Sequence, residues 1–111
     1  MSDAGLGSVT FVGAGPGEFG LLTLVGARTL RFADLVVADD TADLGEVRAL
    51  GVGHADVVHV ADDEYAQLLD AAHDDLKVVR LGHADHFLDR CAHGLLSRLR
   101  DAGVRINVIP G

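Results

Sequence analysis

Cysteine, proline, tyrosine and tryptophan are all scarce in this chain. Its 111 residues include one cysteine, two prolines, one tyrosine and no tryptophan. The single cysteine, Cys91, excludes an internal disulfide framework. No apolar run reaches the ~18 to 20 residues that a membrane-spanning helix requires, and the first residues, Met1, Ser2 and Asp3, lack the basic flank of a signal peptide. We therefore expect a cytoplasmic protein that does not associate with membranes.

Basic residues are also few. Nine Lys and Arg stand against 17 Asp and Glu, for a formal net charge of -8, and a chain this acidic is not expected to bind nucleic acid. The acids are concentrated, because residues 34–75 contain twelve acidic residues and one basic residue. This segment is either a solvated surface that keeps the protein soluble or part of a site that anionic ligands avoid.

Strand-like and helix-like segments alternate along the chain, which has the length of one domain, residues 1–111. The expected strands are continuous apolar runs rather than alternating ones, and this pattern favours a mostly parallel five-stranded sheet with helices on both faces, the doubly wound α/β class. The expected strands are 8–12, 34–38, 56–60, 76–81 and 104–109, and the expected helices are 21–32, 42–50, 62–72 and 86–102.

Two of the expected helices carry further local signals. In the helix 21–32, apolar residues recur at roughly helical spacing. In the helix 62–72, Asp62 is the expected N-cap, and Tyr65, Leu68 and Leu69 form the expected apolar face. Gly103 is expected to end the last helix.

A glycine-rich segment, Gly-Ala-Gly-Pro-Gly at 13–17, follows the first expected strand. Open α/β sheets bind ligands at the carboxyl ends of their strands, so this position favours a ligand-binding loop. A dinucleotide fingerprint would need glycine where Glu18 stands, although Asp39 could serve as its ribose-binding acid. A nicotinamide or flavin site, another ligand site and a turn without a ligand all remain open.

Two polar groups are further candidates for a site. Asp39 and Asp40 close the second expected strand, where one of them could act as a general base or hydrogen-bond a polar ligand, or where both simply begin an acidic loop. His86, Asp89 and His93 fall at helical spacing and could bind zinc or a similar metal. The alternative for this second group is the polar, solvated start of a helix.

Several segments together resemble a known family. They are Val-Thr-Phe-Val-Gly-Ala-Gly-Pro-Gly-Glu at 9–18, Leu-Leu-Thr-Leu-Val-Gly-Ala at 21–27 and Ala-Asp-Leu-Val-Val-Ala-Asp at 33–39. They resemble the amino-terminal domain of the tetrapyrrole (corrin/porphyrin) methylases, with the closest resemblance to the uroporphyrinogen-III C-methyltransferase branch. Residues 78–81 and 102–111 match the family's fourth and fifth strands, so the resemblance spans nearly the whole chain.

This resemblance implies methyl transfer from S-adenosylmethionine to a tetrapyrrole, in porphyrin or cobalamin biosynthesis. In the family the cofactor lies between two α/β domains, usually in a homodimer, and this chain resembles the first domain. Asp39 stands where the family has the acid that approaches the tetrapyrrole. The residues implied to line the substrate cleft are Gly13, Gly15 and Gly17, and those implied to bind the cofactor are Pro16, His83, Ala84, Asp85 and Leu88.

The chain departs from the family pattern at three places. The family's cofactor loop reads Gly-Gly-Asp-Pro-Phe, whereas residues 83–87 read His-Ala-Asp-His-Phe. A base after the second strand is replaced by Asp40, and the basic loop after the third strand is missing. A uroporphyrinogen carries eight carboxylates, which demand basic partners.

We therefore expect the amino-terminal half of a methyltransferase with a degenerate cofactor loop, completed by a second copy or by a chain that supplies the second domain. The alternative is a non-catalytic binding or interaction domain derived from the same fold. An apolar surface around Ile106, Val108 and Ile109 would indicate the completing partner.

Overall fold

The computed structural model describes residues 7–14, 24–83 and 90–109, and these form a five-stranded sheet with helices. Within these residues no helix is both long enough and apolar enough to cross a membrane. The strands are β1 (Ser8–Ala14), β2 (Leu35–Ala38), β3 (Asp56–His59), β4 (Lys77–His83) and β5 (Arg105–Ile109). The helices are α1 (Leu24–Arg31), α2 (Leu44–Arg48), α3 (Glu64–His73) and α5 (Arg90–Asp101).

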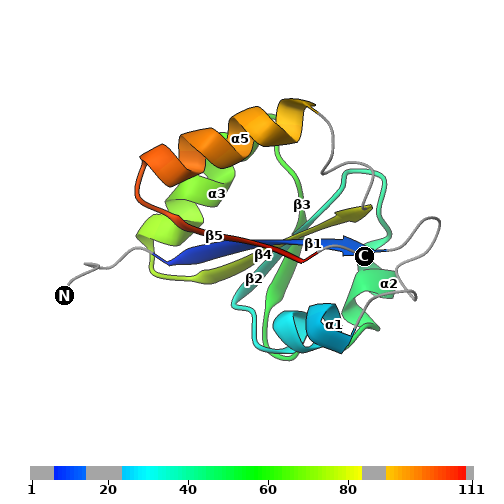
Figure 1. The fold of residues 1–111 in the computed structure, drawn as a ribbon. Helices are drawn as coiled ribbons and strands as arrows, with labels where there is room; N and C mark the ends of the chain where they lie inside the picture. Colours follow the sequence, from blue (N-terminus) through cyan, green and yellow to red (C-terminus); the bar gives the residue numbers. More distant parts are fainter. Residues whose placement is uncertain (1–6, 15–23, 84–89, 110–111) are drawn as a thin grey trace.

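The strands are arranged in the order β3-β2-β4-β1-β5, and every pair is parallel. Helices α3 and α5 cover one face of the sheet, and α1 and α2 cover the other (Figure 1). Because all five strands run the same way, their carboxyl ends meet at one edge, on the right in Figure 1. The predicted doubly wound α/β fold is confirmed.

The core consists of two apolar layers, one on each face of the sheet. On β1, Val9 and Phe11 belong to the layer beneath α3 and α5, together with Leu68 and Leu99 from those helices. Val12 belongs to the layer beneath α1 and α2. This alternation follows from the period of two along a strand, and apolar residues on both faces make the central strands continuous apolar runs.

The two outer strands, β3 and β5, are only partly buried. On β3 only Val57 is buried, and Val58 is 36% exposed. On β5 the side chain of Val108 is 50% exposed. Both strands are sheet edges with a neighbour on one side only, and they are less buried than β1, β2 and β4.

Helix α1 also differs from its expected apolar face. Leu24 is 89% exposed, Val25 is 60% exposed, and Phe32, which lies beyond the end of the helix at Arg31, is 59% exposed. Gly26 and Leu30 are its buried residues. The predicted first turn, residues 21–23, lies outside the described residues.

The N-cap of helix α3 lies one residue later than expected. Asp63, not Asp62, is the N-cap, because its side chain accepts a 3.0 Å hydrogen bond from the backbone N–H of Ala66. The predicted apolar face is confirmed, with Leu68 buried and its neighbours partly buried in the same layer. The Arg98 guanidinium lies 3.9 Å from the ring centre of Tyr65 and links α5 to α3.

The end of α5 agrees with the sequence. Gly103 follows the helix with a φ of +92°, a left-handed conformation that glycine adopts without strain. The chain then enters β5 directly. The predicted first turn of this helix, residues 86–89, lies outside the described residues.

Candidate functional site

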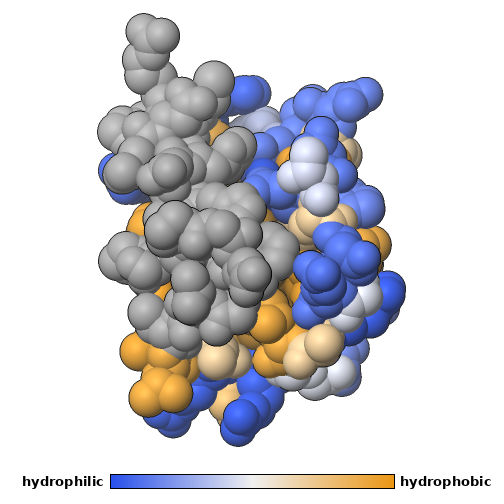
Figure 2. All heavy atoms as spheres, turned by 90° about the vertical axis from the view of Figure 1, so that its right-hand side faces the viewer, coloured by the Kyte–Doolittle hydropathy of each residue, from blue (hydrophilic) through white to orange (hydrophobic). Residues whose placement is uncertain are grey.

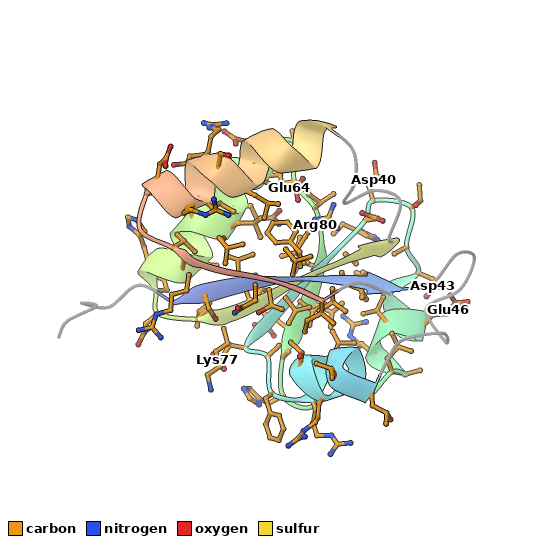
Figure 3. The ribbon with its side chains drawn as sticks, in the orientation of Figure 1. Asp40, Asp43, Glu46, Glu64, Lys77 and Arg80 are labelled. Atoms are coloured by element: carbon orange, nitrogen blue, oxygen red, sulfur yellow. The ribbon has the colours of Figure 1, made fainter. Side chains whose placement is uncertain are left out.

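The candidate site lies at the carboxyl edge of the sheet, where β2, β4 and β1 end side by side. Asp39 follows β2 directly, and Gly82 of β4 is in register with Gly13 of β1. Figure 2 looks onto this edge, and hydrophobic residues gather on its lower part, the side of α1 in Figure 1. Figure 3 shows Asp40, Asp43 and Glu46 at this end of the molecule and Lys77 at the other.

A buried arginine organises this edge. Arg80 of β4 is 2% exposed, and its side chain lies on the α3 and α5 face (Figure 3). Its Nη1 lies 2.8 Å from Asp39 Oδ1 and donates a 2.8 Å hydrogen bond to the carbonyl oxygen of Leu81. Its Nε donates a 2.6 Å hydrogen bond to Glu64 Oε2. One guanidinium therefore joins two carboxylates from different elements.

The surroundings of Arg80 make these partners necessary. Its neighbours in register are Phe11 on β1 and Val37 on β2, both buried apolar residues. Arginine stays protonated in proteins, so its charge is carried into an apolar layer and costs several kcal/mol unless it is paired and hydrogen-bonded. The ion pair with Asp39, the charge-assisted hydrogen bond to Glu64 and the hydrogen bond to the Leu81 carbonyl supply that compensation.

Gly82 determines where the Asp39 carboxylate can lie. A Cβ at position 82 would lie 3.0 Å from Asp39 Oδ2 and 3.1 Å from Oδ1, closer than ordinary contacts. Because glycine has no Cβ, the carboxylate packs against the backbone of β4 while Oδ1 contacts Arg80. The Asp39 side chain is 13% exposed in this position.

A short connection brings Glu64 to Arg80. Only residues 60–63 separate β3 from α3, and Gln67 holds this link from both sides. Its Nε2 donates to the carbonyl oxygen of His59 at 3.1 Å, and its Oε1 accepts from the N–H of Ala61 at 2.9 Å. The first turn of α3 thus begins close to the carboxyl edge, and Glu64 reaches Arg80 from it.

The structure brings together some of the predicted site residues. Asp39, Gly13 and His83 all lie at the ends of neighbouring strands, with Gly13 buried near the end of β1 and His83 the last residue of β4. Asp40 is exposed, and no partner of its side chain is found among the described residues. The others, Gly15, Pro16, Gly17, Ala84, Asp85 and Leu88, lie outside the described residues.

The suggested metal cluster is not found in the described part of the chain. No group of three or more His, Cys, Asp or Glu there is arranged to hold a metal ion. His86 and Asp89 lie outside the described residues, so the structure leaves their grouping with His93 untested.

Sequence reasoning missed Arg80, Glu64 and Gly82. Arg80 did give a signal, because it is a charged residue inside the apolar run of an expected central strand, where only a paired charge is tolerated. Glu64 carried no such signal, since an acidic residue in a first helical turn is common. Gly82 next to the strand end resembled an ordinary loop residue.

Comparisons with known proteins agree with this architecture. The fold and its carboxyl-edge site define an α/β domain of the tetrapyrrole-methylase type. The model of the Tetrapyrrole (Corrin/Porphyrin) Methylases matches residues 8–111, and the chain belongs to this family.

Individual relatives fall in the same group. The chain is 40% identical over 117 aligned positions to siroheme synthase 2 of Pectobacterium atrosepticum. This match covers 95% of this chain and 25% of that protein. It superposes on uroporphyrin-III C-methyltransferase of Thermus thermophilus with a TM-score of 0.79 and 34% identity, covering 95% of this chain and 47% of that one. The structure of that enzyme in complex with S-adenosylhomocysteine superposes with a TM-score of 0.78 and 34% identity, and the match covers 95% of this chain and 45% of that one.

The chain spans about a quarter of the length of these curated relatives and just under half of the solved methyltransferase chains. The family is one of methyltransferases that use S-adenosylmethionine. The described residues fit such a ligand at one point, because Gly13 near the end of β1 carries no side chain, whereas the Asp39 carboxylate already packs against its neighbour Gly82. Bare backbone of this kind allows a ligand to approach the main chain.

Proposed function

We propose that the chain is the amino-terminal domain of an S-adenosylmethionine-dependent methyltransferase that acts on a uroporphyrinogen-III or precorrin-type tetrapyrrole, and that Asp39 is its acid-base residue. The observation that carries this proposal is the position of Asp39. Its carboxylate lies at the carboxyl edge of the sheet, held by Arg80 at 2.8 Å and packed against Gly82. Open α/β sheets bind their ligands at this edge.

The chemistry gives this carboxylate a defined task. When bound, S-adenosylmethionine supplies an electrophilic methyl group for a nucleophilic carbon. Because the acceptor gains a methyl group without its electron pair, it must lose one proton to restore its charge. Asp39 Oδ1 contacts Arg80, so Oδ2 is the oxygen that is placed to take this proton.

The cofactor would meet the chain at the neighbouring strand ends. Gly13 carries no side chain there, and the resemblance places Pro16, His83, Ala84, Asp85 and Leu88 around the same ligand. His83 and Ala84 replace two glycines of the family pattern, so we expect this loop to bind the cofactor weakly. The remaining part of the pocket would come from the second domain.

The exposed apolar residues support a completing partner, either a chain that carries the second domain or a second copy. Of the three β5 residues expected to form an apolar surface, Val108 is 50% exposed, whereas Ile106 and Ile109 are partly buried against the core layers; on α1, Leu24 and Val25 are 89% and 60% exposed. Apolar residues left exposed on a sheet edge and a helix are typical of surfaces that another domain covers.

The first experiment measures methyl transfer from labelled S-adenosylmethionine to uroporphyrinogen III. The chain is mixed with the separately expressed carboxyl-terminal half of uroporphyrin-III C-methyltransferase, and each part is also assayed alone. We expect turnover in the mixture only. In it, Asp39→Asn should lower the turnover number by about a hundredfold or more, the usual contribution of general acid-base catalysis. The exposed neighbour Asp40→Asn is the matched control and should retain full turnover.

Stable association of the two parts without turnover on any tetrapyrrole acceptor would contradict the proposal. Equal losses in Asp39→Asn and Asp40→Asn would contradict the role of Asp39 alone. Calorimetric titration of the chain with S-adenosylmethionine separates the two failures, because it detects cofactor binding without a reaction.

A second candidate function is a non-catalytic binding or interaction domain. It is favoured by the charge at the same edge, where Asp40, Asp43 and Glu46 face solvent (Figure 3). These carboxylates would repel a polycarboxylate acceptor. If this candidate is correct, restoring the family residues with His83→Gly, Ala84→Gly and His86→Pro will create no methyl transfer.

A further inference from the structure

The carboxylate of Asp39 depends on a chain of contacts that begins in α3. Glu64 lies in the first turn of α3 and is 25% exposed, Arg80 is 2% exposed in β4, and Asp39 follows β2. The contacts are 2.6 Å from Arg80 Nε to Glu64 Oε2 and 2.8 Å from Arg80 Nη1 to Asp39 Oδ1. Among the described residues, the guanidinium is therefore the link between the two carboxylates.

The geometry of arginine gives this series of contacts a fixed direction. The guanidinium is planar and presents its N–H groups at fixed angles, so fixing Nε fixes the direction in which Nη1 points. A third contact, from Nη1 to the Leu81 carbonyl oxygen at 2.8 Å, holds the same nitrogen against the β4 backbone. A lysine in the same place could not hold both carboxylates in this way, because its ammonium is a single point charge.

The position of Asp39 is limited from the other side by Gly82. A Cβ at position 82 would lie 3.0 Å from Oδ2, so the carboxylate would have to shift by a few tenths of an ångström to admit it. Among the described residues Oδ1 contacts Arg80 while no donor contacts Oδ2. Arg80 thus selects which oxygen is engaged, and Gly82 leaves space for that orientation.

We propose that Arg80 and Glu64 are positioning residues for Asp39: Glu64 fixes the guanidinium, and the guanidinium fixes the carboxylate with Oδ2 facing the acceptor. This inference rests on the proposed function for the role of Asp39, whereas the coupling itself is a property of the chain alone. Neither residue touches the acceptor in this account.

The test begins with Glu64→Ala, which removes the anchor from a partly exposed position and leaves the N-cap Asp63 in place. We expect the turnover number in the methyl-transfer assay to fall by about 10- to 100-fold with little change in KM, because a misplacement of about 1 Å can cost a hundredfold in rate. Glu64→Gln keeps an acceptor for Arg80 Nε and should restore most of the turnover. Glu46→Ala, in the first turn of α2, is the matched control and should leave the turnover number unchanged, because loss of a surface charge changes acceptor binding rather than the placement of Asp39.

A spectroscopic readout on the isolated chain does not depend on activity. In the chain labelled with both nitrogen and carbon isotopes, Glu64→Ala should speed the exchange of the Arg80 Nε–H with water and shift the carboxyl carbon signal of Asp39, and Glu46→Ala should change neither. Gly82→Ala is a second variant, and it should shift the Asp39 signal while leaving the Arg80 Nε–H bond to Glu64 intact.

The outcomes separate the inference from the proposed function. An Asp39 signal that does not respond to Glu64→Ala would overturn the coupling, whether or not the protein is active. Turnover that is unchanged in Glu64→Ala and lost in Asp39→Asn would also overturn it and leave the proposed function standing. Absence of turnover in the unmodified chain, with both spectroscopic shifts present, would overturn the proposed function and with it the catalytic purpose of the positioning.

Discussion

The two ends of strand β2 each carry an aspartate, and the two aspartates are held in different ways. Asp34 precedes β2 at the amino edge of the sheet and contacts a backbone N–H and a surface histidine. Asp39 follows β2 at the carboxyl edge and contacts a buried arginine. The side chain of Asp34 is 33% exposed, and that of Asp39 is 13% exposed.

At the amino edge the contacts connect three segments. Asp34 Oδ2 accepts a 2.9 Å hydrogen bond from the N–H of Lys77, and Oδ1 lies 3.0 Å from His54 Nε2. The backbone hydrogen bond from Lys77 is the main cause, and the hydrogen bond with His54 the second, of a pKa of Asp34 that is lowered below its ordinary value. Both oxygens are engaged in these contacts, so this aspartate ties the starts of β2 and β4 together.

At the carboxyl edge the arrangement is not needed for such a connection. A buried ion pair contributes little net stability compared with apolar residues of the same size, because both charges must leave water. Keeping Asp39, Arg80 and Glu64 there is therefore better explained by the placement of a carboxylate than by stability. Under the proposed function, aspartates at the two ends of one strand would differ in role, with Asp34 structural and Asp39 chemical.

The largest expected effect comes from removing the buried cation, Arg80, at the carboxyl edge. Arg80→Met replaces the guanidinium by an apolar side chain of similar length and leaves two carboxylates facing each other without a cation. We expect a loss of about 3–5 kcal/mol in the free energy of unfolding, the range found when one partner of a buried pair is removed. Urea denaturation measures it. Arg48→Met, at an exposed position of α2, should change the free energy by no more than about 0.5 kcal/mol. Similar small losses in both variants would show that the pair at Arg80 is not a buried one.

An intermediate effect concerns the start of α3, which carries Glu64 to Arg80. Asp63→Ala removes the N-cap and should cost about 1 kcal/mol. Asp62→Ala should cost almost nothing, because the structure assigns the cap to Asp63. The two variants are compared by thermal unfolding at pH 7. A greater loss in Asp62→Ala would place the cap where the sequence suggested and would contradict the observed α3 boundary.

The smallest effect tests the amino edge through its pH dependence. Because the pKa of Asp34 is lowered in the folded state, its carboxylate stabilises the fold at pH values above its ordinary 3.8, and this contribution is lost as the pH falls through the lower folded value. Asp34→Asn should therefore be slightly less stable than the unmodified chain at neutral pH, and the difference should shrink below pH 3.8. Urea midpoints measured at several pH values check this. A difference that grows as the pH falls would contradict the sign.

Much of the fold could be predicted from the sequence, because burial on both faces makes central parallel strands recognisable as apolar runs. All five described strands were expected within two residues of their observed bounds at each end. The burial of the edge strands and of α1 could not be predicted in the same way. Whether Val58, Val108 or Leu24 is covered depends on strand order and on neighbouring domains, and neither is written in the local pattern.

The candidate site was predictable only in part. Asp39 was identified from its position after a strand and from the resemblance, and it does lie at the carboxyl edge. Its partners were not identified, since Glu64 is 16 positions from Arg80 in sequence and meets it only through the short β3 to α3 connection. Contacts between side chains on different elements follow from tertiary packing, which local sequence signals do not specify.

The most direct test of the account is to determine whether the cofactor binds at the carboxyl edge or at the amino edge of the sheet. The nitrogen-labelled chain, with the unlabelled carboxyl-terminal half of uroporphyrin-III C-methyltransferase present, is titrated with S-adenosylhomocysteine, and the backbone amide signals are followed by NMR. The account predicts shifts at the carboxyl edge, at Gly13, Asp39 and Gly82, and none at Asp34 or His54. Shifts confined to the amino edge, or no shifts up to millimolar cofactor, would contradict the claim that the carboxyl edge carries the chemistry.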